Sequence, residues 1–250
     1  DLCKKTDNIS DSVEIAIVGK YVSLKDAYIS IYEALHHCER ENNVNVKIRW
    51  VDSELLEKEN PDKILHGIDG LIVPGGFGNR GIEGMINALK YSRKNNIPTL
   101  GICLGMQLMV VEFMRNIVGL KDANSLEFSS TTKNPVINLM EEQVNIENKG
   151  GTMRLGKYPC TLDANTKAFD AYKNSLIYER HRHRFEFNND YRDIAIKNGL
   201  KIVGTSPDNK LVEMVEVSNK LWMVGVQFHP ELSSRPNRPH PLFRDLVKYS

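Results

Sequence analysis

Short apolar runs alternate with segments of helical periodicity over the first half of the chain. Four runs have the length of strands that are buried on both faces: 13–18, 44–51, 70–74 and 98–102. Three segments between or after them have apolar residues at helical spacing or almost throughout: 25–41, 81–94 and 104–114. This alternation predicts an α/β fold with a doubly wound, mostly parallel open sheet and helices on both faces.

The second half is less regular and predicts loops and mixed strands. Residues 119–152 are rich in Asn, Glu, Lys and Gly. Four later segments are typical of strands: 176–187, 200–205, 211–217 and 222–228. Residues 241–249 predict a closing helix with Pro241 in its first turn. No repeat or clear linker divides the chain, so we expect a single domain over residues 1–250.

Composition narrows the class of function. Hydrophobic residues make up 41% of the 250 residues and charged residues 26%, which is typical of a globular protein. The formal net charge of +1 gives no overall field that would attract nucleic acid or an acidic membrane. No apolar run reaches the roughly 18 residues of a membrane-spanning helix. We therefore expect a soluble protein that acts on a small molecule.

Cysteine usage and the first residues bear on the compartment. Four cysteines are scattered without a CxxC pair: Cys3, Cys38, Cys103 and Cys160. This pattern favours free thiols in a reducing cytoplasm. The opening residues DLCKKTD contain neither an initiating Met nor the apolar core of a secretory signal, so we expect an excised piece of a longer chain.

The segment with the most chemical information is Gly101-Ile102-Cys103-Leu104-Gly105, between a predicted strand and a predicted helix. It matches a cysteine version of the nucleophile elbow, in which small residues on either side let the backbone turn sharply. The partial positive charge of the following helix N-terminus would favour a thiolate. Taken alone, Cys103 could equally be a buried structural cysteine.

A glycine-rich segment, residues 74–81, follows the third predicted strand. The carboxyl ends of parallel strands are where open α/β sheets bind ligands. Residues 76–81 also satisfy GxGxxG, which suggests a dinucleotide site, although that motif normally follows the first strand. The other interpretation is that the Gly76 N–H receives an oxyanion while Phe77 covers a substrate.

The tripeptide His229-Pro230-Glu231 ends the last apolar run. Proline disfavours a helical conformation at His229, so we expect an extended segment whose alternate residues face the same side. Glu231 could then orient the imidazole while its other nitrogen faces a thiol. The alternative is an ordinary surface histidine.

Metal binding is the competing use of cysteine and histidine. The candidate ligands are His36, His37, His181 and His183. Because the chain has no HExxH and no CxxC pair, we expect no metal site.

The basic run at 179–184 has a separate interpretation. Strand alternation would place Arg180, Arg182 and Arg184 on one face. Such a face suits either a solvated stripe or one arginine that binds a carboxylate.

Three motifs taken in order resemble the class I, triad-type glutamine amidotransferases: PGGFGNRG at 74–81, GICLGMQ at 101–107 and HPE at 229–231. Flanking segments narrow the resemblance to the glutaminase domain of the CTP synthases, of eukaryotic type: 19–35, 125–130 and 179–188. The resemblance covers nearly the whole chain. It implies that residues 1–12 are a linker from an N-terminal synthetase domain that this chain lacks.

The resemblance also implies a role for each matching residue. Cys103 matches the nucleophile, His229 the base that later acts as an acid, and Glu231 the residue that orients it. The backbone N–H groups of Gly76 and Leu104 match the oxyanion hole. Four residues match the contacts of glutamine: Phe77, Gln107, Glu127 and Arg184.

The implied activity is hydrolysis of L-glutamine to glutamate and ammonia through a cysteine thioester. The ammonia would feed ATP-dependent amination of UTP to CTP in the synthetase domain, with Mg and GTP also used by the full-length enzyme. No cofactor is implied for this domain, and the full-length enzyme is expected to be a homo-oligomer. The absence of a GxxxxGK[ST] phosphate loop agrees with an isolated glutaminase portion.

Two rival functions stay open at this point. One is another cysteine hydrolase of the same fold, of the type that cleaves γ-glutamyl peptides. The other is a catalytically silent regulatory domain. A Glu127/Arg184 pair suited to a free amino acid argues against the first, and the filled triad positions argue against the second.

Overall fold

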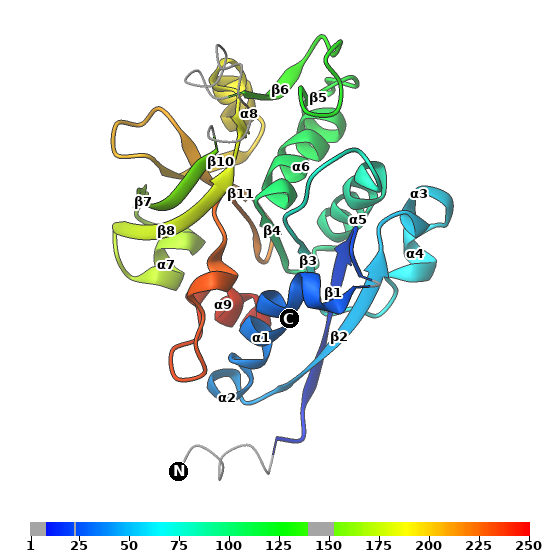
Figure 1. Ribbon diagram of the computed structural model, residues 1–250, viewed down its shortest axis with the longest axis vertical. Helices are drawn as coiled ribbons and strands as arrows, with labels where there is room; N and C mark the ends of the chain where they lie inside the picture. The colour runs from blue at the N-terminus through cyan, green and yellow to red at the C-terminus, as the bar shows by residue number, and fades with distance from the viewer. Residues whose placement is uncertain (1–8, 23, 140–152) are drawn as a thin grey trace.

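The computed structural model describes residues 9–22, 24–139 and 153–250. Five strands of its main sheet run parallel to one another: β2 (Asn45–Asp52), β1 (Ser12–Gly19), β3 (Gly70–Val73), β4 (Thr99–Ile102) and β12 (Met223–Val226). Four more continue the sheet with antiparallel pairing: β11 (Val212–Val217), β10 (Leu200–Thr205), β7 (Arg154–Leu162) and β8 (Leu176–His183). The nine strands lie in the order β2-β1-β3-β4-β12-β11-β10-β7-β8 (Figure 1).

Helices cover both faces of this sheet. On β1, Ala16 and Val18 face one core while Ile15 and Ile17 face the other, because successive side chains of a strand point to opposite sides. The first core is covered by α5 (Ile82–Asn95), α6 (Leu104–Phe113) and α8 (Arg192–Lys197), and the second by α1 (Ile29–His36), α7 (Lys167–Tyr172) and α9 (Pro241–Tyr249). Figure 1 shows α1 and α9 together on one side of the strands. The doubly wound, mostly parallel α/β fold is confirmed.

Smaller elements complete the described chain. Three short strands form a second sheet in the order β5 (Asn124–Ser125), β6 (Pro135–Leu139) and β9 (Phe185–Phe187). The short helices are η2 (Lys25–Tyr28), α2 (Glu39–Asn42), α3 (Leu55–Lys58), α4 (Pro61–Ile64), the π-helix η3 (Met114–Val118), η6 (Asn189–Tyr191) and η7 (Pro230–Ser233). Among the described residues, no helix is long and apolar enough to cross a bilayer.

The single helix predicted over 25–41 is wrong, because the segment forms η2, α1 and α2 in succession. Tyr28 marks the first break with a non-helical backbone. Its hydroxyl accepts the backbone N–H of Lys20 at 3.0 Å and of Tyr21 at 3.3 Å. The chain therefore bends to bring this side chain against the end of β1.

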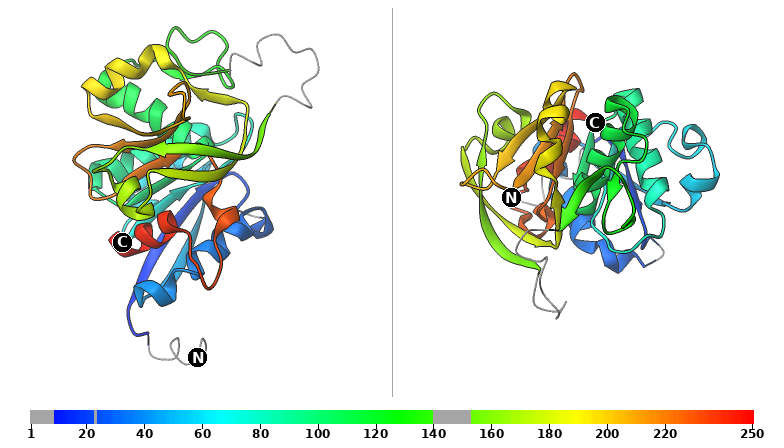
Figure 2. Two further views of the ribbon diagram at one scale, coloured as in Figure 1. Left: turned by 90° about the vertical axis from the view of Figure 1, so that its left-hand side faces the viewer. Right: turned by 90° about the horizontal axis from the view of Figure 1, so that it is seen from above.

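The strand predicted over 176–187 is divided between two sheets, with β8 ending at His183 and β9 beginning at Phe185. Its partner β7 escaped prediction because it contains Gly156 and Pro159, which disfavour strands. Pro159 is tolerated because β10 pairs with β7 only near Thr161 and Leu162, so the missing N–H interrupts no ladder there. Figure 2 shows β7 and β8 running side by side as a long ribbon.

Candidate active site

Cys103 occupies a strained turn between β4 and α6. Its backbone angles are φ 53° and ψ −102°, which a residue with a side chain rarely adopts. A Cβ on Gly101 would lie 2.8 Å from the Gly105 backbone, and one on Gly105 would lie 1.9 Å from the Val73 carbonyl oxygen. Only glycine fits at these two positions, so the sharp strand-to-helix turn predicted from the sequence is confirmed.

The turn brings His229 and Glu231 next to this cysteine. The Cys103 N–H donates to the Val226 carbonyl at 2.7 Å, which ties the end of β12 to the turn. A Cβ on Gly75 would lie 3.0 Å from His229 Cε1 and 3.6 Å from Cys103 Cβ. Gly75 therefore packs against both side chains. His229 Nδ1 contacts Glu231 Oε1 at 2.8 Å.

The backbone conformation that brings Glu231 to His229 differs from the expected one. Residues 229–231 are not a continuing extended segment, because Pro230 begins the 3₁₀-helix η7 and Glu231 lies within it. Proline suits the first position of a helix, where its missing N–H is not needed. The helical turn folds Glu231 back to His229, so the predicted pairing holds although the predicted backbone conformation does not.

The charge on His229 depends on its neighbours. Burial by itself would lower the pKa of His229, but interactions with Cys103 and Glu231 outweigh burial and raise it to about 10. Its Nε2 atom is buried and has no hydrogen-bond partner among the described residues. This nitrogen is therefore available to the cysteine.

A cavity of about 110 Å³ opens beside the sulfur. Seven of the nine predicted site residues line it: Gly76, Phe77, Cys103, Leu104, Gln107, Glu127 and Arg184. Met153, His183 and Phe185 complete the lining. The structure thus brings these residues together, and His229, bound to Glu231, interacts with Cys103.

Two backbone N–H groups at the cavity can receive an oxyanion. Leu104 is the first residue of α6, so its N–H has no acceptor within the helix. Within the described part of the chain, the Gly76 N–H also lacks a hydrogen-bond partner. The Gly76 Cα faces the Leu104 side chain, since a Cβ there would lie 3.5 Å from Leu104 Cδ2.

Polar side chains across the cavity provide charges of both signs. Burial raises the pKa of Glu127, while the Gly78 N–H, Lys20 and Arg184 act in the opposite direction. Glu127 Oε1 accepts the Gly78 N–H at 3.3 Å. Phe77 is 49% exposed at the entrance, with the Arg182 guanidinium 5.8 Å from its ring centre. A small zwitterion in the cavity would therefore meet charges of both signs, Glu127 and Arg184.

The family profile named glutamine amidotransferase class-I matches residues 23–249. The chain belongs to this family. The glutaminase domain of Trypanosoma brucei CTPS, solved with bound acivicin, is 38% identical with a TM-score of 0.88, over 95% of this chain and 93% of that one. A glutamine amidotransferase from Thermotoga maritima, 15% identical with a TM-score of 0.54 over 95% of each chain, shares the fold.

CTP synthases from bacteria are more similar in sequence to this amidotransferase than the trypanosome domain is. That of Clostridium acetobutylicum is 55% identical over 247 residues, and that of Carboxydothermus hydrogenoformans 56% over 246 residues. The matches cover 99% and 98% of this chain but only 46% of each relative, so the chain spans about half their length. These identities exceed that to the trypanosome domain and give no support to the eukaryotic type expected from the sequence.

One residue of this amidotransferase that the sequence did not reveal is Lys20, which holds the glycine-rich segment 74–81 in place. Lys20, at the end of β1, is buried, and its Nζ donates to the carbonyls of Phe77 and Gly78. Burial lowers the pKa of Lys20 to about 8, opposed by Glu127. Lys20 follows a predicted strand, but nothing in the local pattern shows that it reaches a loop more than fifty residues away.

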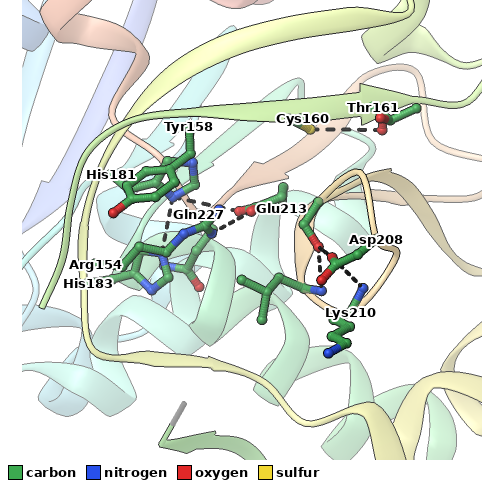
Figure 3. A network of polar contacts seen from close by, with 12 residues as sticks. Arg154, Tyr158, Cys160, Thr161, His181, His183, Asp208, Lys210, Glu213 and Gln227 are labelled. Carbon is green, nitrogen blue, oxygen red and sulfur yellow. Dashed lines mark hydrogen bonds and ion pairs between the residues drawn. The ribbon is translucent and has the colours of Figure 1, made fainter. Parts of the chain in front are cut away.

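A buried cluster behind the cavity includes two of the histidines considered as metal ligands (Figure 3). His181 Nδ1 lies 3.0 Å from His183 Nε2 and 3.6 Å from Glu213 Oε2. Burial, reinforced by Arg154, lowers the pKa of His181 to about 2 and of His183 to about 3. The predicted alternation is confirmed within β8, with His181 and His183 buried and Arg180 and Arg182 exposed, but not for Arg184, which lies beyond the end of β8 and lines the cavity.

The geometry of this cluster does not favour a divalent cation. The two ring nitrogens that face each other already form a hydrogen bond. The guanidinium of Arg154 already balances the Glu213 carboxylate. A metal ion would have to break the first contact and would place further positive charge beside the guanidinium.

Proposed function

We propose that this chain hydrolyses the side-chain amide of L-glutamine to glutamate and ammonia, with Cys103 as the nucleophile. One observation carries the proposal. The strained turn presents the Cys103 sulfur to a cavity, and a carboxylate-bound histidine interacts with the same cysteine. Nucleophile, base and orienting carboxylate in this order are the requirement for acyl transfer.

In the proposed reaction, Cys103 attacks the amide carbon and the carbonyl oxygen becomes an oxyanion. The N–H groups of Gly76 and Leu104 stabilise that charge. His229 gives its proton to the departing ammonia, and Glu231 fixes the imidazole and stabilises its protonated form. Water, deprotonated by His229, then attacks the thioester and releases glutamate.

Recognition of glutamine is assigned to the opposite wall of the cavity. Glu127 accepts hydrogen bonds from the α-ammonium group, and Arg184 binds the α-carboxylate with its planar fork. Gln107 donates both Nε2 hydrogens to protein acceptors, so its carbonyl oxygen is the group that can accept an N–H from the substrate. Phe77 covers the entrance.

The similarity to CTP synthases extends the proposal to a longer enzyme. Those relatives are about twice as long as this chain. We place this chain as their glutaminase domain, joined through residues 1–12 to a synthetase domain that uses the ammonia, with ATP and Mg, to convert UTP to CTP. GTP regulation, homo-oligomerisation and a cytoplasmic location belong to that proposed full-length enzyme.

Glutamate release from glutamine by the isolated chain tests this function, with a γ-glutamyl dipeptide as the competing substrate. We expect release from glutamine and none from the dipeptide, and no release by Cys103→Ala. Cleavage of the dipeptide in preference to glutamine would support the peptide hydrolase. A folded chain that is inactive on both, also when supplied with its synthetase portion, would support the silent regulatory domain.

A further inference from the structure

Gln227 is a buried residue next to the reactive sulfur to which sequence reasoning assigned no role. It follows the last residue of β12 and is 0% exposed. Its side-chain Nε2 lies 3.8 Å from Cys103 Sγ, within hydrogen-bond distance for a sulfur acceptor. Figure 3 shows Gln227 beside the buried histidines and Glu213, whose backbone carbonyl accepts the Gln227 N–H at 2.9 Å.

The hydrogen-bond network determines which end of the Gln227 amide faces the sulfur. The Phe185 carbonyl can only accept, so Gln107 must direct its Nε2 to it, at 2.9 Å. The same nitrogen lies 3.2 Å from the other end of Gln227, which must therefore be the oxygen Oε1. The Gln227 NH₂ group is left to face Cys103, so it is a donor that points at the sulfur.

A second set of contacts holds this arrangement in place. His183 Nδ1 also donates to the Phe185 carbonyl, at 3.0 Å. Its Nε2 must then accept, so His181 Nδ1 donates to it. The buried histidine pair thus fixes the Phe185 carbonyl, which in turn fixes Gln107 and, through it, Gln227.

Besides His229, the sulfur has two polar neighbours that suit its two protonation states. The Arg182 carbonyl lies 3.8 Å from Sγ and can accept only from a thiol. The Gln227 N–H can donate to a thiolate, whose charge strengthens the hydrogen bond. His229, with Glu231 bound to it, interacts with Cys103. Glu127 and Arg184 line the same cavity as the sulfur. Gln227 therefore adds a neutral donor on another side of the sulfur.

We propose that Gln227 is a positioning residue for the nucleophile, which holds the Cys103 sulfur as a thiolate directed at the cavity. The hydrogen bond from Gln107 sets the direction of the Gln227 amide. This inference rests on the proposed function, in which that sulfur attacks glutamine. It adds a donor outside the catalytic triad and the oxyanion hole.

The test compares Gln227→Met and Gln227→Asn with wild type. The first replaces the amide by an apolar group of similar length, and the second withdraws the amide by one methylene. Thr99→Val is the matched control, because Thr99 is equally buried and lies at the other end of β4 from Cys103, where its hydroxyl donates to the Ile97 carbonyl. Urea unfolding identifies the variants that are folded under assay conditions.

Two readouts follow the sulfur itself. One is the ultraviolet absorbance of the thiolate, measured against the same background with Cys103→Ala. The other is the rate of Cys103 alkylation by a small haloacetamide. For both Gln227 variants we expect less thiolate absorbance and alkylation slowed about 10-fold, the effect of losing a hydrogen bond to a charged group. We expect kcat for glutamine to fall in proportion and KM to change little, whereas Thr99→Val should match wild type in all of these.

A folded Gln227→Met or Gln227→Asn variant with wild-type thiolate absorbance and alkylation would overturn the proposal, and either variant alone suffices for this. Failure of the proposed function gives a different result. Wild-type chain that is alkylated at Cys103 but never releases glutamate would contradict glutamine hydrolysis, while the comparison of the variants by absorbance and alkylation would still decide the role of Gln227.

Discussion

Among the described residues, two buried histidine–carboxylate pairs have nearly the same geometry. In one pair, His229 Nδ1 lies 2.8 Å from Glu231 Oε1. In the other, His240 Nε2 lies 2.9 Å from Glu179 Oε1. All four side chains are mostly or fully buried. Distance and burial alone therefore do not tell an active pair from a structural one.

The pairs differ in what the second ring nitrogen does. His240 Nδ1 accepts the Leu242 N–H at 3.3 Å and so caps α9, and the Tyr172 hydroxyl also donates to Glu179 at 2.8 Å. Every polar atom of His240 is thus occupied by the fold. In the described part of the chain, His229 Nε2 has no such partner, and the His229 ring interacts with Cys103. A histidine–carboxylate pair can take part in catalysis only when one nitrogen is left for a reactant.

The largest contrast should come from removing each histidine. We expect His229→Ala to slow glutamine hydrolysis by about 10²–10⁴-fold, the usual contribution of a general base. His240→Ala should keep wild-type activity per folded molecule but lower the free energy of unfolding by about 2 kcal/mol, because buried partners lose their hydrogen bonds. Initial rates and urea unfolding of both variants check this. Similar losses of activity in both variants would break the distinction between the two pairs.

A smaller contrast is expected for the carboxylates. Glu231→Gln should slow hydrolysis less than His229→Ala does, because the base remains while its orientation and charge stabilisation are weakened. Glu179→Gln should leave the rate unchanged and destabilise the fold, since the Tyr172 hydroxyl and His240 both donate to that carboxylate. Rates of thioester formation, followed by rapid quench, separate the two variants. If Glu231→Gln were as slow as His229→Ala, the orienting role of Glu231 would be wrong.

The last contrast is the pH dependence of the unfolding free energy, compared between wild type and His229→Ala. The raised pKa of His229, about 10 against an ordinary 6.5, means that the folded state keeps a proton which the unfolded state loses. The resulting stabilisation is complete below the ordinary value and disappears as the pH rises through about 10. The difference in unfolding free energy between wild type and His229→Ala should therefore shrink across this range. A difference that is constant or grows with pH would contradict a raised pKa.

What could be inferred from the sequence was the chemistry encoded by neighbouring residues. The turn at Cys103 depends on Gly101 and Gly105, and the contact between His229 and Glu231 spans only two residues. Closing helix α9 begins at Pro241 and ends at Tyr249, as the sequence predicted, because proline and helical periodicity are local signals.

Contacts between distant strands could not be inferred in this way. Gln227 reaches Cys103 because β12 pairs with β4, and Gln107 of α6 reaches the Phe185 carbonyl, which lies seventy-eight residues along the chain. The alternation of histidine and arginine at 180–183 was visible, but which face is buried depends on the sheet. Nothing in the local sequence indicated that His240 has a carboxylate partner, since Glu179 lies sixty-one residues away.

The most direct test of the central claim is the site at which a glutamine-like electrophile reacts. The chain is incubated with such a compound, digested, and the adduct located by mass spectrometry. We expect one adduct, on Cys103, which glutamine suppresses and which His229→Ala slows, while His240→Ala leaves it unchanged. An adduct on Cys3, Cys38 or Cys160 in place of Cys103 would contradict the assignment of the active site.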